Sequence, residues 1–339
     1  MNVLVNTASV QLGALRYDCH ATSLEIELTL LPGIGTLRMS LPPQVEVSAR
    51  PGDEAVLKLN NGEGAELVLT GTVRRVARGP RRTELVAADA GAVLAAARMA
   101  QSFQNLPPGE VLRKIAGDLG LTALSMLTAL DPMPVYVADQ RRTAGEHVAR
   151  LAELGGGYAA VEAGGRISAQ PWPFLPPTKA LLQGREVIDY AAWDYGAEAD
   201  LAFVGASPAS AGADLRALAQ ATEPVAGGAG DPAPDLHWLQ RPMLRSGLGV
   251  SGAAEGARAA RASRRSRMRA TCWLLPGLRP GDVIEVQGLA EGISGGPWML
   301  VRVQHSLRRD QGGTTRIAAV SARGTGLLDA LSGLAGALP

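Results

Sequence analysis

The sequence predicts an α+β fold that is mainly β, with two tube-like antiparallel β-barrel domains and an inserted helix-helix-hairpin module. Three observations lead to this prediction. Apolar and polar residues alternate near both ends of the chain, as they do in strands, whereas the middle of the chain shows helical periodicity. Glycine and proline are frequent, with 41 and 22 copies among 339 residues. Turn-forming residues in such numbers are typical of a protein with many short connections.

Residues 1–90 are expected to form the first β-barrel. From Leu24 to Leu30 apolar and polar residues alternate, the period that places apolar side chains on one face of a strand. Turn signals follow at residues 51–53 and 61–62, and closing the strands into a barrel would remove exposed edges. The further strands are predicted at Val56–Leu59, Leu67–Val76 and Thr83–Ala88.

Residues 91–175 are expected to form the inserted module. Apolar residues on one face predict a helix over 110–119, with a glycine at its C-terminal end. A second helix is predicted to begin at Thr143, because Glu146 three residues later completes a capping box, and three glycines end it. Two short strand patterns around residues 164–165 then predict a hairpin.

Strand patterns return after the module, and residues 176–205 and 263–325 are expected to form the second β-barrel. Residues 206–262 are expected to hold a flexible insertion and a basic helix, because their first part is rich in Ala, Gly, Pro and Asp. The helix itself is predicted over 252–269. The last segment, 326–339, is interpreted as a C-terminal tail.

Within the basic helix, the twelve residues 258–269 contain six arginines and no acidic residue. Helical spacing would bring several of them into one stripe. Two readings remain open: a solvated face, or contact with acidic protein surface across a subunit interface, which arginine favours through bidentate pairs. Nucleic acid is disfavoured, because no base-stacking aromatics are interleaved with the arginines. The predicted interface residues of this segment are Arg258, Arg261, Arg264, Arg265 and Arg269.

The C-terminal tail is apolar but a poor isolated helix. Its leucines recur at helix-like spacings, while Gly333 and Gly336 weaken a helix. Such a segment is expected to become ordered by docking onto a partner or a neighbouring subunit, or by packing against the second barrel of its own chain. The predicted interface residues here are Leu327, Leu328 and Leu331.

The sequence contains no pattern typical of a catalytic, cofactor-binding or metal site, and no enzymatic activity is predicted. Cys19 and His20 are adjacent, so on a strand they would point to opposite faces. Glu25 and Glu27 share one strand face and are interpreted as solubilising. Lys plus Arg number 33 and Asp plus Glu number 32, which gives no overall attraction to nucleic acid. No membrane anchor and no secretory signal are predicted.

Several segments together resemble the tail hub proteins of contractile phages. Residues 99–121 resemble a family segment that leads into a short helix ending in Gly-Leu, and residues 143–158 resemble its second helix with a glycine ending. Residues 278–288, 296–305 and 313–315 are similar to the family's closing barrel, which has a Pro-Gly turn, a Gly-aromatic strand and a His before a Gly-x-Thr hairpin. Late control gene D proteins and the N-terminal region of type VI secretion valine-glycine repeat proteins share this pattern.

The resemblance covers about 24–175 and 270–322 and implies a structural hub without cofactors. In the family, three subunits form a ring that adapts a hexameric inner tube to a trimeric spike. The implied partners are two further copies of the chain, the tail tube protein, a trimeric spike, other baseplate components and the tape-measure protein. His305 would be a structural barrel residue. The protein would be made in the bacterial cytoplasm and become part of a phage tail, tailocin or extracellular injection particle.

Two departures from the family pattern matter. The insertion at 206–235 obscures the start of the second barrel, and no spike domain follows within the sequence, so the spike is expected to be a separate polypeptide. Three alternative functions remain open. They are a tail-tip hub of a non-contractile tail with an associated cell-wall hydrolase, a free-standing peptidase or glycosidase, and a nucleic-acid-binding adaptor acting through the basic helix.

Overall fold

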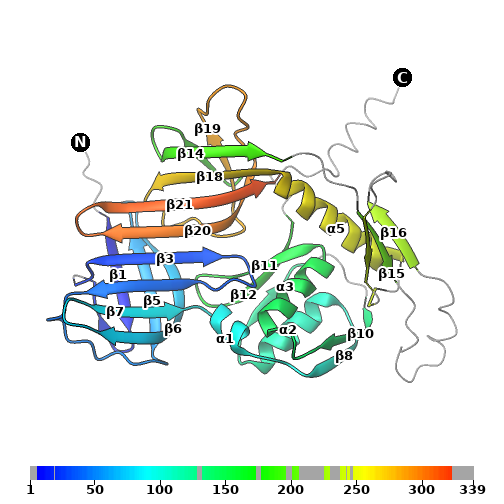
Figure 1. Ribbon diagram of the computed structural model, residues 1–339, viewed down its shortest axis with the longest axis horizontal. Coiled ribbons are helices and arrows are strands. Elements are labelled where there is room, and N and C mark those ends of the chain that lie inside the picture. The colour runs from blue at the N-terminus through cyan, green and yellow to red at the C-terminus, as the bar shows by residue number, and fades with distance from the viewer. Residues whose placement is uncertain are drawn as a thin grey trace.

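The protein is dominated by one curled, thirteen-stranded sheet, with a smaller α+β module beside it (Figure 1). This computed structural model describes residues 6–18, 20–127, 132–172, 177–195, 201–205, 225–229, 237–241, 243–244 and 247–322. The predicted class, α+β and mainly β, is confirmed by the succession of strands and helices. Among the described residues, no helix has the length and apolar character needed to cross a membrane.

The first half of the sheet follows the predicted period of two. Leu24, Ile26 and Leu28 are buried, whereas Glu25 and Glu27 between them are only partly buried. The tight turn after Asn60 is stabilised by the side chain of that residue, which accepts hydrogen bonds from two backbone amides. The strands are β1 (Thr7–Leu12), β2 (Leu15–Arg16), β3 (Ser23–Thr29), β4 (Thr36–Leu41), β5 (Glu54–Asn60), β6 (Ala65–Arg78) and β7 (Thr83–Ala88).

The second half of the sheet is built from two separate stretches of the chain. The long strands β20 and β21 form a hairpin, and β18 and β14 extend it to the far edge of the sheet. Short strands β13 and β19 pair with each other, and β19 also pairs with β20. The strands are β13 (Lys179–Leu182), β14 (Val187–Asp194), β18 (Ser266–Trp273), β19 (Val283–Gln287), β20 (Trp298–Arg308) and β21 (Gly312–Ser321).

The two halves meet where β3 pairs antiparallel with β20. In this pairing Ile26 lies opposite His305, and both side chains are fully buried. One apolar core runs through both halves, from Leu57 in the first to Ile317 in the second. The two half-barrels are therefore parts of a single sheet around a shared core.

The inserted module has its own apolar core, in which Leu112 and Ile115 of one helix meet Val148 and Leu151 of another. The predicted helices and hairpin are present. Three strands that the sequence analysis did not predict, β8, β9 and β10, complete it. The elements are α1 (Gly91–Ala96), β8 (Gln101–Leu106), α2 (Pro108–Asp118), β9 (Ala123–Ser125), β10 (Met133–Ala138), α3 (Ala144–Leu154), β11 (Gly157–Val161) and β12 (Ile167–Pro171).

The basic helix, α5 (Gly247–Arg265), packs against this module and then continues directly into β18 (Figure 1). Val250 and Ala253 belong to the module core. Gly256 lies so close to Gly156 that a Cβ atom on Gly256 would be 2.4 Å from the Gly156 Cα atom. The helix therefore connects the module to the second half of the sheet.

The prediction that the helix extends over 252–269 is wrong at its C-terminal end. The helix stops at Arg265, and Arg269 lies on strand β18. Met268 and Ala270 are buried while Arg269 between them is exposed, which is the period of a strand. The spacing of the arginines suggested a continuing helix, but pairing with β14 and β21 determines the conformation here.

Within the segment expected to be a flexible insertion, two short strands are described. They are β16 (Val225–Ala229) and β17 (His237–Gln240), and both pair with β15 (Leu201–Gly205) in a separate sheet. The predicted tail, including Leu327, Leu328 and Leu331, lies outside the described residues, and so does Cys19.

Candidate partner-binding groove

Within the described parts of the chain, no group of three or more His, Cys, Asp or Glu side chains is placed to hold a metal ion. His305 is fully buried, and its Nδ1 atom lies 3.0 Å from the hydroxyl oxygen of Thr315. Burial, and then the positive charge of Arg279, lowers the pKa of His305 to about 3. The imidazole at the seam of the sheet is therefore neutral and shielded from solvent, which is compatible with the structural role that the resemblance implies.

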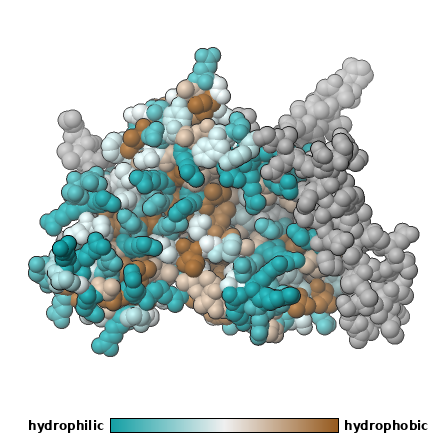
Figure 2. Space-filling view, in the orientation of Figure 1, coloured by the Kyte–Doolittle hydropathy of each residue, from teal (hydrophilic) through white to brown (hydrophobic). Residues whose placement is uncertain are grey.

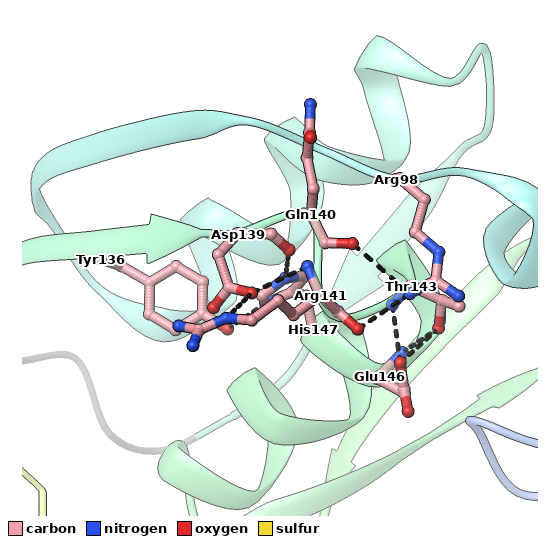
Figure 3. Close-up of polar contacts among 8 residues, drawn as sticks. All are labelled: Arg98, Tyr136, Asp139, Gln140, Arg141, Thr143, Glu146 and His147. Atoms are coloured by element: carbon pink, nitrogen blue, oxygen red, sulfur yellow. Dashed lines mark hydrogen bonds and ion pairs between the residues drawn. The ribbon is translucent and has the colours of Figure 1, made fainter.

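A second buried histidine belongs to a closed polar network in the module (Figure 3). The Nε2 atom of His147 lies 3.0 Å from the main-chain oxygen of Asp139, which can only accept a hydrogen bond. With Nε2 as the donor, the Nδ1 atom accepts from the Tyr136 hydroxyl, 2.9 Å away. Both side chains are almost fully buried, and burial raises the pKa of Tyr136 above its ordinary value. This pair orders the module and offers no substrate access.

The capping box predicted at the start of α3 lies in the same network (Figure 3). The amide of Thr143 donates to a Glu146 carboxylate oxygen at 2.6 Å, and the amide of Glu146 donates to the Thr143 hydroxyl oxygen at 3.1 Å. The hydrogen bond from the Thr143 backbone lowers the pKa of Glu146. Arg98 donates to the main-chain oxygen of Arg141 at 2.9 Å, which connects α1 to this loop.

Glu25 and Glu27 form cross-strand ion pairs on the outer face of the sheet. A carboxylate oxygen of Glu27 lies 2.8 Å from a guanidinium nitrogen of Arg302, and one of Glu25 lies 3.6 Å from Arg308. Each pair joins β3 to β20. Both carboxylates thus form ion pairs at the surface, in keeping with the interpretation of these residues as solubilising.

A groove with a volume of about 500 Å³ lies where the outer face of the sheet meets the module. In the view of Figure 2, hydrophilic residues dominate over the sheet and hydrophobic residues gather toward the middle, beside the module. The module side of the groove contains Tyr158 and Trp172, whose ring centroids are 5.7 Å apart. Trp172 also packs with Met299 and Val320 in a small apolar core beneath the groove, which joins the module, α5 and the second half of the sheet.

Four arginines line the sheet side of the groove, which we therefore call the arginine groove: Arg264, Arg267, Arg269 and Arg302. The guanidinium carbon of Arg269 lies 5.5 Å from the centroid of the Trp193 ring. That of Arg267 lies 5.0 Å from the Tyr195 ring, at cation–π distance. Arg267 also donates from Nε to the main-chain oxygen of Arg264 at 3.3 Å. These contacts orient the guanidinium groups without neutralising them.

The structure separates the arginines that the sequence analysis grouped together. Arg264 and Arg269 are exposed and line the groove, as does Arg267, whereas Arg258 and Arg265 are partly buried on α5. Arg261 is also partly buried and lines a second hollow between α3 and α5.

Two residues that line the groove were not predicted from the sequence. Arg302 and Trp193 reach it only through strand pairing, and Tyr195, just beyond the end of β14, contacts Arg267. For Arg302 the polar–apolar alternation over residues 302–304 was a usable signal, because it places this side chain on the same face as Gln304 and opposite to Val303.

No protein-family model matches the sequence, and no curated protein matches it. Solved structures do match. One is the 43 kDa tail protein of prophage MuSo2 from Shewanella oneidensis, at a TM-score of 0.69, with 13% identity over 94% of this chain and 99% of that chain. Another is a tail protein from Neisseria meningitidis MC58, at a TM-score of 0.71, with 13% identity over 93% and 96% of the two chains.

The chain has the fold of a phage tail protein. A third similar structure is an Escherichia coli component of the type VI secretion system, described as structurally similar to the T4 bacteriophage tail proteins gp27 and gp5. It matches at a TM-score of 0.56 and 13% identity, over 92% of this chain and 76% of that chain. The resemblance seen in residues 24–175 and 270–322 therefore agrees with the fold, and the structural match extends over more than nine-tenths of the chain.

Proposed function

We propose that this tail-protein fold serves as the structural hub of a contractile tail or injection-system baseplate. Three copies would form a ring that adapts the hexameric inner tube to a trimeric spike. The observation that carries the proposal is the composition of the sheet, which has two half-barrels of similar size. β1 to β7 form one, and β13, β14 and β18 to β21 form the other. Three subunits with two such half-barrels each would present six similar units to the tube and three to the spike.

The similar structures support the spike and tube as partners. The type VI relative is described as similar to two different T4 tail proteins, and another solved neighbour, at a TM-score of 0.54, is a complex of PdpA with VgrG from Francisella. This chain covers 59% of that neighbour's length. Other baseplate components and the tape-measure protein are further proposed partners.

The remaining predicted interface residues belong to the same proposal. On α5, Arg258, Arg261 and Arg265 would face a neighbouring subunit, and the tail leucines Leu327, Leu328 and Leu331 would dock onto the spike or a second copy. Deleting residues 327–339 is expected to leave the melting temperature nearly unchanged and to weaken co-purification with the spike. A large loss of monomer stability would show instead that the tail packs on its own chain.

The test of the hub function is the stoichiometry of the complete assembly. The full chain is co-expressed with the tube and spike proteins of the same particle, and the complex is measured by light scattering and electron microscopy. We expect three copies per spike trimer, stacked on the tube. A stable dimer or hexamer in the presence of spike would contradict the trimeric ring. A complex with a cell-wall hydrolase and no sheath would favour the tail-tip alternative.

A further inference from the structure

We propose that the arginine groove is a docking site for an acidic, extended peptide segment of a partner protein. The segment would carry carboxylates at alternate positions, facing Arg267 and Arg269 on the sheet. An apolar side chain between them would face Tyr158 and Trp172 on the module. Only the expectation that this partner belongs to the same particle rests on the proposed function, because the chemistry follows from the groove itself.

The spacing of the arginines matches an extended chain. Arg267 and Arg269 lie two positions apart on β18 and are both exposed, so their Cα atoms are about 7 Å apart. Carboxylates at alternate positions of an extended peptide have the same separation. Ala318 lies opposite both Arg269 and Arg302 in the strand register, which places these two arginines about 10 Å apart across the sheet. The cations thus cover an area that one short peptide strand can span.

Three of the four groove arginines have no carboxylate partner. Among the described residues, no carboxylate forms an ion pair with Arg264, Arg267 or Arg269, whereas Arg302 pairs with Glu27, and Glu153 is the only acidic side chain that lines the groove. Guanidinium groups this close repel one another, and salt screens the repulsion only partly, at a Debye length of about 8 Å. Carboxylates from a partner would relieve this repulsion and form charge-assisted, bidentate hydrogen bonds.

The aromatic contacts favour a peptide over nucleic acid. The faces of Trp193 and Tyr195 on this side are covered by the guanidinium groups of Arg269 and Arg267, so they are not available to stack on bases. The stacked guanidinium groups keep their nitrogen edges for carboxylates, and less side-chain entropy is lost when a ligand binds.

The opposite wall of the groove explains why the segment should also carry an apolar residue. Tyr158 is partly exposed, and Trp172 beside it belongs to the core beneath the groove. Ala318 and Val301 on the sheet side are small or apolar and leave room between the two walls. A volume of about 500 Å³ is within the usual range of ligand-binding clefts. A peptide with alternating acidic and apolar side chains presents each kind to the wall that matches it.

Binding is tested with the full chain and a fluorescein-labelled peptide of sequence Gly-Ser-Asp-Leu-Asp-Leu-Gly-Ser, followed by fluorescence anisotropy. We expect saturable binding that weakens as salt is raised. The double variant Arg267→Gln and Arg269→Gln is expected to raise the Kd by about tenfold or more. The matched control, Arg308→Gln with Arg309→Gln, removes the same charge at the far end of β20 and should leave the Kd unchanged. Circular dichroism verifies that both variants fold.

A second variant tests the geometry without removing an arginine. Ala318→Glu places a carboxylate between Arg269 and Arg302, where it should neutralise the groove from within and abolish peptide binding. A peptide with Asn in place of Asp should not bind, and one with consecutive Asp residues should bind more weakly. Equal binding of the Asp peptide to the wild type and to the Arg267 and Arg269 double variant would overturn the proposal. So would the absence of binding by the wild type.

Labelled single-stranded oligothymidine serves as the competing probe. If it binds more tightly than the peptide and is lost in the same double variant, the groove is a nucleic-acid site and the peptide proposal is wrong. The stoichiometry of the hub complex is measured separately with wild-type chain. A correct trimer without peptide binding would contradict only the groove proposal, and peptide binding without a trimer would contradict only the hub proposal.

Discussion

Two sets of exposed arginines, one in each half of the large sheet, differ in the groups that they contact. In the first half, Arg82 lies 2.6 Å from a carboxylate oxygen of Glu84, and Arg16 lies 2.7 Å from one of Asp18. In the second half, Arg267 and Arg269 contact aromatic rings instead and, within the described residues, pair with no carboxylate. Internally paired charges suit a solvated surface, whereas unpaired and oriented charges suit a surface that meets a partner.

The halves also differ in how they connect to the inserted module. The first half passes into the module through one short turn at Asp89, whose carboxylate accepts a hydrogen bond from the amide of Gly91 at 2.8 Å. The second half is connected through a 19-residue helix that packs on the module with small residues. The groove is lined mainly by the second half, where the end of α5 adds Arg264. Four experiments test these differences, from the largest expected effect to the smallest.

The largest effect is expected at the seam between the halves, where His305 is buried. Its lowered pKa means that the folded state keeps the imidazole neutral while the unfolded chain binds a proton below about pH 6.5. Stability should therefore fall as pH falls from about 6.5 toward 3, by roughly 4–5 kcal/mol from this group. Urea unfolding across this range is compared for the wild type and His305→Asn, which should show a weaker dependence. His20→Asn, at an exposed position, is the control and should follow the wild type.

The connection between the first half of the sheet and the module, at Asp89, should change the stability with pH in the opposite direction. Burial raises the pKa of Asp89 to about 6, against the opposing effect of its hydrogen bonds from Gly91 and Gly35. The folded state therefore favours the protonated acid, and this stabilisation is complete below about pH 4 and lost as pH rises through 6. The loss is about 3 kcal/mol. Asp89→Asn should remove this dependence and raise the melting temperature at pH 7.5. A melting temperature that falls at pH 7.5 would show that the ionised carboxylate is needed.

The connection between the second half of the sheet and the module depends on the packing of α5 against the module. Gly256→Ala adds a Cβ atom 2.4 Å from the backbone of Gly156, and the helix must shift to accommodate it. We expect a loss of about 1–3 kcal/mol in the free energy of unfolding, together with weaker peptide binding in the groove. Gly252→Ala is the matched control, because its Cβ would meet nothing within 4 Å, and it should stabilise the helix by about 0.5–1 kcal/mol. Equal effects of the two substitutions would mean that the close approach is unimportant.

The smallest effect is expected on the paired surface of the first half. Glu84→Gln removes the acidic partner of Arg82 and Arg75, but exposed ion pairs contribute little, so stability should change by about 0.5 kcal/mol or less. The variant then has unpaired arginines without the apolar wall of the groove. We expect no binding of the acidic peptide at this surface, measured in a chain that also carries the Arg267 and Arg269 substitutions. Binding restored by Glu84→Gln would show that unpaired charge alone is sufficient.

The prediction from sequence succeeded where a local pattern and the final environment agree. The alternation in β3 was visible because one face of that strand is buried, and the capping box of α3 lies within four consecutive residues. The prediction failed where the side chains of a strand are mostly polar, or where pairing with a strand distant in the sequence determines the conformation. In β8 only Phe103 is buried, so the strand shows no alternation of apolar residues. The end of α5 was missed because the spacing of the arginines fits a helix as well as it fits a helix followed by a strand.

The sequence by itself determined the class of the fold, the order of its strand-rich and helical regions, and the presence of an excess of arginines near residue 260. These properties follow from periodicity, capping and composition, which act between neighbouring residues. Only the tertiary structure decided which arginines face one another. Arg269 and Arg302 are 33 positions apart and come to one surface because β21 lies between their strands, while Trp193 reaches Arg269 through the pairing of β14 with β18. Strand pairing is set by the shared core, which no local pattern specifies, and so the groove could not be read from the sequence.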